Sequence, residues 1–366
     1  MPGRDRIRVG VVGANPRYGW GAQAHVPAFK ALPEYELLAV CTSRPETASE
    51  AAQAFGVPFA YHDYHDLVEN PDIDLVSVAV KVPYHAELAL AAIEAGKHVF
   101  CEWPLAANTV EAQAMLDAAR RHGVRHAVCL QARLSPTVLY MKELIEAGYI
   151  GKPQSCAVTH FAPFAGGRGR TTEGAWAARR AAGANMLTIR TGHDIDMLRF
   201  CLGEFGELAA DVETLAPWKL TDTGQVIETD VPDSIIVSGR LINGMTSSLH
   251  IGGHLGPGSG WRMEVYGSEG TLVATSPGLV QWASIRLQGG KVGEALADLA
   301  APDRLRWAPA EVSPLQPYNV AQLLRRFAQS IHDGADIEPN FETALSLHQL
   351  LDNIQRASDS RSRLTF

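Results

Sequence analysis

Short apolar runs alternate with longer amphipathic stretches over the first third of the chain. Runs such as IRVGVV, YELLAV, IDLVSVAV and KHVFCE are rich in β-branched residues and have the length of buried strands. The stretches between them, such as PETASEAAQAFG and TVEAQAMLDAARRHG, carry apolar residues at helical spacing and end in glycine, which commonly terminates helices. The alternation predicts βαβ units, and hence a doubly wound parallel sheet, over residues 1–131.

The pattern changes in the remainder of the chain, residues 132–366. Segments such as PQSCAVTHFAP, DSIIVSGRLINGMTSSLHIGG and WRMEVYGSEGTLVAT alternate between apolar and polar positions and are joined by glycine turns. They predict an α+β domain with a large, mostly antiparallel sheet. One long helix is expected near residues 184–202, and two C-terminal helices either complete this domain or pack back on the first. Residues 163–183, rich in Gly and Arg, predict a loop near a site.

Composition narrows the class of protein. With 366 residues, of which 46% are hydrophobic and 20% charged, the chain suits two globular domains. A net charge of −8 argues against a nucleic-acid surface, and no apolar stretch reaches the length of a membrane span. Five scattered cysteines without CxxC spacing indicate reduced thiols, and the histidines form no metal-ligand pattern. A cytoplasmic protein with a small-molecule partner and no metal is expected.

A glycine-rich turn follows the first predicted strand. In GVVGANPRYGWGAQAH, Gly13 matches the first glycine of a dinucleotide-binding turn, while Asn15 stands at the second position and the turn is longer than usual. Small residues let backbone N–H groups approach a pyrophosphate. A glycine-rich turn that binds no ligand is the alternative.

The end of the second predicted strand bears on the choice of cofactor. The residues there are Cys41, Thr42, Ser43 and Arg44, so no carboxylate is available for a ribose 2′-hydroxyl. A hydroxyl and a guanidinium suit a 2′-phosphate. The pattern favours NADP(H), with NAD(H) as the second possibility, and a solvated arginine heading a helix is the alternative reading.

With these elements placed, the chain resembles the Gfo/Idh/MocA oxidoreductase family along nearly its whole length. The resemblance rests on the first turn and on DIDLVSVAVKVPYHAELALAAIEAGKHVFCEWPLA, LQARLSPTVLYMKELIEAGYIGKP, TGHDIDMLRFCLG, YGSEGTLVAT and FETALSLHQLLDNI. It implies an N-terminal Rossmann domain and a C-terminal α+β domain whose open sheet often mediates oligomerisation, here a homodimer or homotetramer. It also implies sugars or polyols as usual substrates.

The sequence differs from the family pattern at two of the expected catalytic positions. Typical members carry Glu-Lys-Pro after strand five and, later, an Asp and a His separated by three residues. Here Glu102 and Pro104 match, Trp103 replaces the lysine, His193 matches the histidine and Ile189 stands at the aspartate position. GWGAQAHVPA, EW and MLTIRTGH look most like the Gal80-like branch, whose yeast member is a dinucleotide-binding repressor.

His193 is therefore the expected acid/base, because an imidazole transfers protons in either direction near neutral pH. Lys81, at the end of the fourth strand, is expected to aid catalysis or else to be a solvated lysine. Tyr84 is expected to aid catalysis near the cofactor, the alternative there being that His85 caps or heads its helix. Arg133 either binds substrate or forms a salt bridge between domains. The expected cofactor-binding residues are Gly13, Asn15, Tyr18, Trp20, Ser43, Arg44, Val80, Pro83, His85, Glu102, Trp103 and Gln131. The expected substrate-binding residues are Arg133, His160, Trp176 and Arg190.

Three functions follow from these expectations. The first is an NAD(P)(H)-dependent oxidoreductase that acts on a sugar, polyol or related hydroxy or carbonyl compound by hydride transfer. The second is a Gal80-like, non-catalytic sensor that binds a dinucleotide. The third is redox-neutral cleavage of a glycoside, in which a tightly held cofactor is regenerated.

Overall fold

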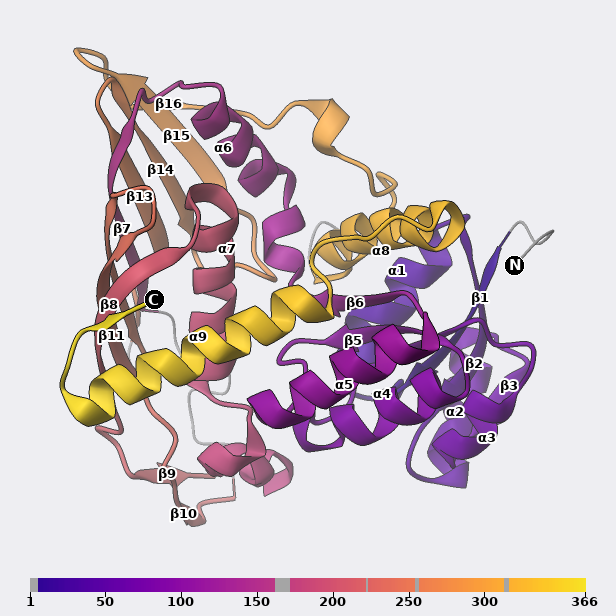
Figure 1. Cartoon of the computed structure of the whole chain (residues 1–366). Coiled ribbons are helices and arrows are strands. Elements are labelled where there is room, and N and C mark those ends of the chain that lie inside the picture. Colours follow the sequence, from indigo (N-terminus) through magenta and orange to yellow (C-terminus); the bar gives the residue numbers. More distant parts are fainter. Residues whose placement is uncertain (1–5, 162–171, 222, 254–256, 313–315) are drawn as a thin grey trace. The chain divides into compact units, whose positions relative to one another are not determined.

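The computed structural model describes residues 6–161, 172–221, 223–253, 257–312 and 316–366 (Figure 1). The chain divides into two compact units. The first contains the residues up to Gln131 together with Arg306–Ser346, and the second contains Ala132–Leu305 together with Leu347–Phe366. In the described ranges, no helix is long and apolar enough to cross a bilayer.

The first unit is built on a six-stranded parallel sheet with the strand order β3-β2-β1-β4-β5-β6. In this order β2 and β3 are added on one side of β1, and β4, β5 and β6 are added on the other side. The order is that of the Rossmann fold and confirms the predicted doubly wound sheet. Strands β1, β4, β5 and β6 are nearly continuous buried apolar runs, as expected when helices cover both faces, whereas the edge strand β3 is largely exposed. The strands of this sheet are β1 (Ile7–Val12), β2 (Tyr35–Cys41), β3 (Phe59–Tyr61), β4 (Leu75–Val78), β5 (His98–Glu102) and β6 (His126–Cys129).

Helices of the first unit follow the predicted apolar stretches. Asp63 and Asn108 accept backbone N–H groups at two helix N-termini, and Gly56 and Gly123 end two helices in the left-handed conformation. From the end of the chain, α8 (Gln316–Asp333) packs against α1. The other helices are α1 (Val26–Ala31), α2 (Pro45–Phe55), α3 (Tyr64–Glu69), α4 (His85–Glu94) and α5 (Thr109–His122).

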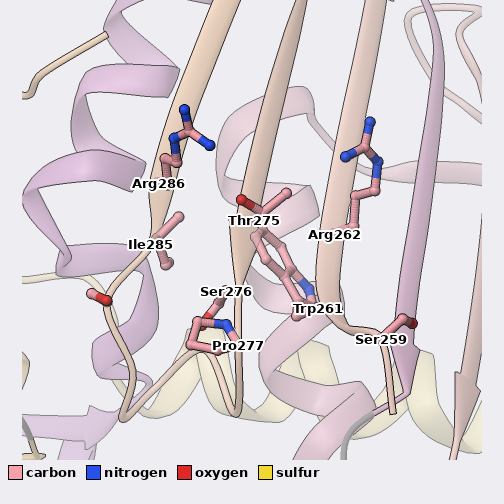
Figure 2. Close-up of a pocket in the computed structure, with 9 residues that line it drawn as sticks. Ser259, Trp261, Arg262, Thr275, Ser276, Pro277, Ile285 and Arg286 are labelled. Carbon is pink, nitrogen blue, oxygen red and sulfur yellow. The ribbon is translucent and has the colours of Figure 1, made fainter. Parts of the chain in front are cut away.

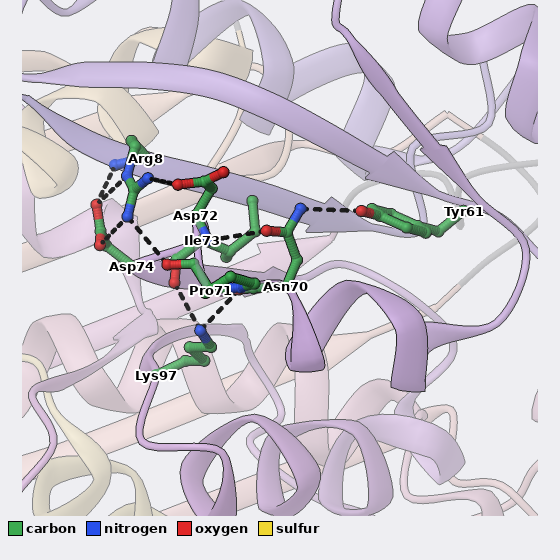
Figure 3. Close-up of polar contacts among 8 residues, drawn as sticks. All are labelled: Arg8, Tyr61, Asn70, Pro71, Asp72, Ile73, Asp74 and Lys97. Atoms are coloured by element: carbon green, nitrogen blue, oxygen red, sulfur yellow. Dashed lines mark hydrogen bonds and ion pairs between the residues drawn. The ribbon is translucent and has the colours of Figure 1, made fainter.

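A polar network joins the amino ends of β1 and β4 (Figure 3). The Arg8 guanidinium donates two hydrogen bonds of 3.0 Å to the Asp74 carboxylate and also binds Asp72. These acidic partners raise the pKa of Arg8. Lys97 Nζ donates to the carbonyl oxygens of Asn70 and Ile73, at 2.9 Å each. The network occupies the edge of the sheet opposite to its carboxyl edge.

The second unit contains a nine-stranded sheet in the order β16-β15-β14-β13-β7-β12-β11-β8-β17. All neighbouring pairs are antiparallel except β7 with β12, which confirms the predicted mostly antiparallel sheet. Its strands are β7 (Pro153–Phe161), β8 (Phe205–Glu213), β11 (Ser234–Leu241), β12 (Thr246–Gly252), β13 (Gly260–Gly267), β14 (Gly270–Ser276), β15 (Arg286–Lys291), β16 (Ala297–Asp298) and β17 (Leu364–Thr365). A separate hairpin, not predicted, pairs β9 (Trp218–Leu220) with β10 (Val226–Glu228).

Helices α6 (Pro136–Glu146) and α7 (Gly192–Leu202) lie on one face of this sheet (Figure 1). A π-helical turn, η6 (Met186–Thr191), runs directly into α7, so the predicted helix near 184–202 is present. Asn185 caps it by accepting the backbone N–H groups of Leu187 and Thr188. Helix α9 (Phe341–Ser360) begins in the first unit and ends in the second.

Candidate functional site

The expected cofactor residues lie along one edge of the parallel sheet. Gly13 follows β1, Ser43 and Arg44 follow β2, and Val80 follows β4. Trp103 and Gln131 follow β5 and β6 in the same way. Ligands of open α/β sheets bind at this carboxyl edge, where the strand order reverses. Topology therefore brings together side chains that are up to 118 positions apart.

The glycine-rich turn forms a backbone cradle between β1 and β4. Gly13 has φ +97°, and a Cβ placed there would lie 2.2 Å from the Ala79 carbonyl oxygen. At Gly21 a Cβ would lie 2.7 Å from the Gly13 carbonyl oxygen. Both positions require glycine because the backbone segments touch. This close approach fits the binding of a dinucleotide.

Glu102 anchors the turn from the end of β5. Its Oε1 accepts a hydrogen bond of 2.8 Å from Trp20 Nε1 and lies 2.5 Å from His25 Nε2. His25 Nδ1 lies 2.7 Å from Ser77 Oγ, so the imidazole bridges the buried Ser77 hydroxyl and the half-buried Glu102 carboxylate. The Cys129 thiol lies beside this cluster, and burial raises its pKa well above the usual range. A carboxylate that accepts several hydrogen bonds is an anchor for the turn rather than a free base.

The residues around the EWP stretch are also fixed from within the first unit. Trp103 is buried, with 4% of its surface exposed. His85 Nδ1 lies 2.8 Å from the Pro104 carbonyl oxygen, and its Nε2 lies 3.1 Å from that of Val80. Burial lowers the pKa of His85, so this imidazole is neutral near pH 7. The His85 side chain thereby connects the segment after β4 to the segment after β5.

Several expected residues are more exposed. Lys81 and Pro83 are exposed, and Tyr84 has 54% of its surface exposed. The side-chain oxygen of Asn15 accepts the backbone N–H of Arg17. Ser43, Arg44 and Tyr18 are exposed as well.

Gln131 differs from these residues. It is 1% exposed, and its Oε1 has no hydrogen-bond partner among the described residues. A buried acceptor without a partner at the carboxyl edge is what a bound ligand would satisfy.

In the second unit, His193 lies in the first turn of α7 and is 3% exposed. Burial, and secondarily the charge of His160, lower its pKa to about 3, so the ring is neutral at ordinary pH. His160, on β7, lies with its Nδ1 2.8 Å from Asp194 Oδ2. The buried atoms His160 Nε2, His193 Nδ1 and Asp194 Oδ1 have no hydrogen-bond partner in the described ranges.

Two arginines of the second unit, Arg133 and Arg190, have protein partners. The Arg133 guanidinium forms a buried, two-pronged ion pair with Asp196, Nε to Oδ2 being 2.8 Å. Both residues belong to the second unit, so this pair does not join the two units. Arg190 donates from Nη1 to the Gly252 carbonyl oxygen at 3.1 Å, and burial lowers its pKa. Trp176 is half-buried in a short helix, Thr172–Ala178.

Sequence reasoning missed four of these polar residues, His25, Ser77, Asp194 and Asp196. The two aspartates had a visible signal, because HDID places two carboxylates inside an otherwise apolar helical segment. His25 and Ser77 had none, since a lone histidine and a lone serine are common in any helix or strand.

A pocket lies on β13, β14 and β15, and none of the expected site residues lines it (Figure 2). Arg262, Thr275 and Arg286 face one another in successive strand pairs along this sheet. Both arginines form ion pairs on the surface, with Glu264 and Asp298 respectively. Trp261, which also lines the pocket, is the strand neighbour of His160. The polar cluster of His160 therefore lies one strand from the pocket.

Comparison with known proteins places this geometry in a family. Residues 7–130 match the model of the oxidoreductase family with an NAD-binding Rossmann fold, and residues 136–276 match that of the Gal80p C-terminal domain. Dehydrogenase aclE of Aspergillus oryzae is 39% identical over 251 residues, covering 64% of this chain and 67% of its own.

A second relative and a solved structure both carry the name levoglucosan dehydrogenase. Levoglucosan dehydrogenase of Pseudarthrobacter phenanthrenivorans is 30% identical over 292 residues, 74% of this chain and 73% of its own. A structure of levoglucosan dehydrogenase in complex with NADH and levoglucosan superposes with a TM-score of 0.86 at 25% identity, covering 98% of this chain and 99% of that one. The chain therefore belongs to the Gfo/Idh/MocA oxidoreductase family and carries a Gal80-like C-terminal domain.

Proposed function

We propose that this protein is a nicotinamide-dependent dehydrogenase or reductase that acts on a sugar, a polyol or a related hydroxy-carbonyl compound. The observation that carries the proposal is His193, a buried neutral imidazole whose Nδ1 has no partner among the described residues. A ring nitrogen with no structural hydrogen bond is available for proton transfer. Dehydrogenases of levoglucosan and inositol among the relatives support the substrate class.

The first unit supplies residues that would hold the cofactor. The cradle at Gly13 and Gly21 suits the pyrophosphate, and the unpartnered oxygen of Gln131 suits a polar group at the same edge. When bound, the dinucleotide supplies the nicotinamide that accepts or donates hydride. Glu102 contributes indirectly, because it holds Trp20 and His25 of the turn in place.

NADP(H) is the proposed preference within this function. Arg44 and Ser43 are exposed at the end of β2, and no carboxylate follows that strand before α2 begins. A guanidinium there would bind a 2′-phosphate, whereas a family member that binds NAD(H) gains from an acid at this point. NADH complexes are known for the levoglucosan dehydrogenase relative, so NAD(H) is the competing cofactor.

Proton transfer then falls to His193. The indole of Trp103 has a single N–H donor and cannot accept a hydroxyl proton, so it does not replace the family lysine in this step. Lys81 and Tyr84 are placed on the segment after β4 and are proposed to assist at the carboxyl edge. In the oxidative direction the hydroxyl proton of the substrate passes to a ring nitrogen of His193 as hydride leaves the adjoining carbon.

The test combines spectroscopy and substitution. Purified protein is mixed with NADP⁺ or NAD⁺ and a panel of sugars, polyols and glycosides, and the absorbance of reduced nicotinamide is followed with product analysis. His193→Ala is expected to lower turnover about 100-fold or more while cofactor affinity stays unchanged. Full turnover by this variant would remove the acid/base role of His193.

The second candidate is a non-catalytic sensor that binds the dinucleotide. It is favoured by Trp103 at the lysine position and by the match to the Gal80p C-terminal domain. Cofactor binding without a change in absorbance or any product across the panel would support it. Product that forms without net cofactor reduction would instead indicate redox-neutral glycoside cleavage.

A further inference from the structure

His160 and Asp194 form a buried acid–imidazole pair behind His193. His160 lies on β7 and Asp194 on α7, and the side chains of both are fully buried. The distance of 2.8 Å from His160 Nδ1 to Asp194 Oδ2 is that of a charge-assisted hydrogen bond. An imidazole that donates Nδ1–H to a carboxylate carries its lone pair on Nε2, so the pair has an oriented proton acceptor.

That acceptor belongs to a group of buried polar atoms without protein partners. Within the described ranges, His160 Nε2, Asp194 Oδ1, His193 Nδ1 and Thr191 Oγ1 all lack a hydrogen-bond partner. Folded proteins leave few buried polar atoms without a hydrogen bond, so four of them on β7, η6 and α7 indicate a binding partner such as an ordered water. A water, with two to four polar partners, is the smallest molecule that would connect them.

His193 by itself is a weak base and binds a proton poorly. Burial, with a smaller contribution from the charge of His160, lowers its pKa to about 3. A base this weak returns a substrate proton faster than solvent removes it, unless a better acceptor takes the proton onward. The carboxylate of Asp194 would stabilise a cationic His160, and no such partner contacts His193 in the part of the chain described.

We propose that His160, held in orientation by Asp194, is the terminal proton acceptor of this site and that His193 relays the substrate proton to it. The inference rests on the proposed dehydrogenase function and extends it by one residue pair. His160 acts through His193, so it is a relay residue and does not contact the substrate.

The proton balance closes without a charged His193. In the oxidative direction the substrate hydroxyl proton joins one ring nitrogen of His193, while the proton on its Nδ1 moves through a water to His160 Nε2. His193 ends neutral in the opposite tautomer, and His160 ends as an imidazolium beside the Asp194 carboxylate. The substrate loses one hydride to the oxidised nicotinamide and one proton to His160, and reduction reverses both transfers.

Among the described residues of α7 and η6, the titratable groups near His160 are Asp194, His193 and Arg190. Burial lowers the pKa of Arg190, and the charge of Asp194 opposes that shift. The strand neighbour on β13 is Trp261, and on β12 it is Ile251, neither of which carries a charge. Asp194 therefore supplies the negative charge beside His160. The cationic Arg190, and His193 if it were protonated, would disfavour a positive charge on His160.

The first test reads proton positions directly and does not depend on turnover. In the full-length protein labelled with ¹⁵N-histidine, NMR should show His160 protonated at Nδ1 and bare at Nε2 at neutral pH. On acidification the first proton of the cluster should be bound by His160 while His193 stays neutral. In Asp194→Asn, His160 should no longer bind the first proton ahead of His193. His193 taking the first proton, or His160 bare at Nδ1, would overturn the relay.

The second test measures single-turnover cofactor reduction with a substrate found active. His160→Gln is expected to slow the chemical step about 100-fold while KM and cofactor affinity change less than twofold. Asp194→Asn should slow it less and shift its pH profile. His348→Gln, which replaces another buried histidine of the second unit, is the matched control and should leave the rate unchanged. An unchanged rate in His160→Gln would contradict the relay. If the wild-type protein is inactive on every substrate, that result contradicts the proposed function instead. The NMR measurement then decides whether His160 is the proton acceptor.

Discussion

Trp20 Nε1 donates a hydrogen bond of 2.8 Å to Glu102 Oε1, across 82 positions of sequence. The same oxygen lies 2.5 Å from His25 Nε2. Two residues from the start of the first helical segment are thereby attached to the end of β5. The glutamate of the EWP stretch thus serves the glycine-rich turn, even though the residue that follows it is no longer a lysine.

Glu102→Ala should lower both stability and cofactor affinity. Truncation removes the carboxylate that the Trp20 indole N–H and the buried His25 ring contact, which should cost about 2–4 kcal/mol in the free energy of unfolding. Glu102→Gln keeps an acceptor oxygen and should cost about half as much. Urea denaturation and dinucleotide titration measure the two effects. As a control, Glu50→Ala removes an exposed ion pair with Arg17 and should cost less than about 1 kcal/mol. Equal losses for Glu50→Ala and Glu102→Ala would argue against the anchor.

Gly13→Ala should strongly weaken dinucleotide binding. The added Cβ would lie 2.2 Å from the Ala79 carbonyl oxygen at a φ of +97°, so β1 and β4 would have to separate at the cradle. Isothermal titration measures the loss, expected to exceed tenfold in affinity. Gly96→Ala is the control, because Gly96 also has positive φ but a Cβ there meets nothing within 4 Å. That variant should lose about 1 kcal/mol of stability and bind the cofactor normally. Normal binding by Gly13→Ala would exclude the cradle as the dinucleotide site.

Asp196→Ala should be among the most destabilising single substitutions in the second unit. It removes the carboxylate of the buried ion pair with Arg133, which should cost about 3–5 kcal/mol. Thermal and urea denaturation measure the change. Asp298→Ala removes an exposed carboxylate bound to Arg286, and it should cost less than about 1 kcal/mol. A small loss at Asp196 would show that Arg133 reaches another partner, and substrate would then be a candidate.

Stability should fall on mild acidification, in part through His348. Burial lowers the pKa of His348 to about 4, whereas an unfolded histidine titrates near about 6.5. Between those values the unfolded chain binds a proton that the folded protein excludes, so the free energy of unfolding decreases as pH falls, by up to about 1.4 kcal/mol per pH unit. His348→Gln should make this slope shallower in urea denaturation at a series of pH values. His332→Gln, at an exposed position, should leave the slope as it is.

Arg44→Ala should change cofactor preference. Loss of the guanidinium is expected to weaken NADP(H) about tenfold or more, because a charge-assisted contact to phosphate is removed. Affinity for NAD(H), which lacks the 2′-phosphate, should change little. Titration of both cofactors against the variant and the wild-type protein measures the difference. Equal losses for the two cofactors would refute the 2′-phosphate assignment.

The fold could be predicted because its signals are local. Buried strands such as IRVGVV and amphipathic helices ending in glycine report their own conformation through period and length. The changed pattern after residue 131 likewise indicated a different sheet. What local pattern did not report was the hairpin at Trp218–Leu220 and Val226–Glu228, whose short strands carry too few residues for a period to emerge.

The sequence by itself determined the family resemblance, the order of secondary-structure elements and the residue types at the carboxyl edge of the parallel sheet, since each follows from neighbours along the chain. Only the tertiary structure decided which polar groups meet. Glu102 joins Trp20 and His25, Arg133 joins Asp196, and His160 joins Asp194 because strand order and helix packing bring distant positions within hydrogen-bond range. Burial then sets their chemistry, because the free energy of a charge depends on surroundings that no single stretch of sequence contains.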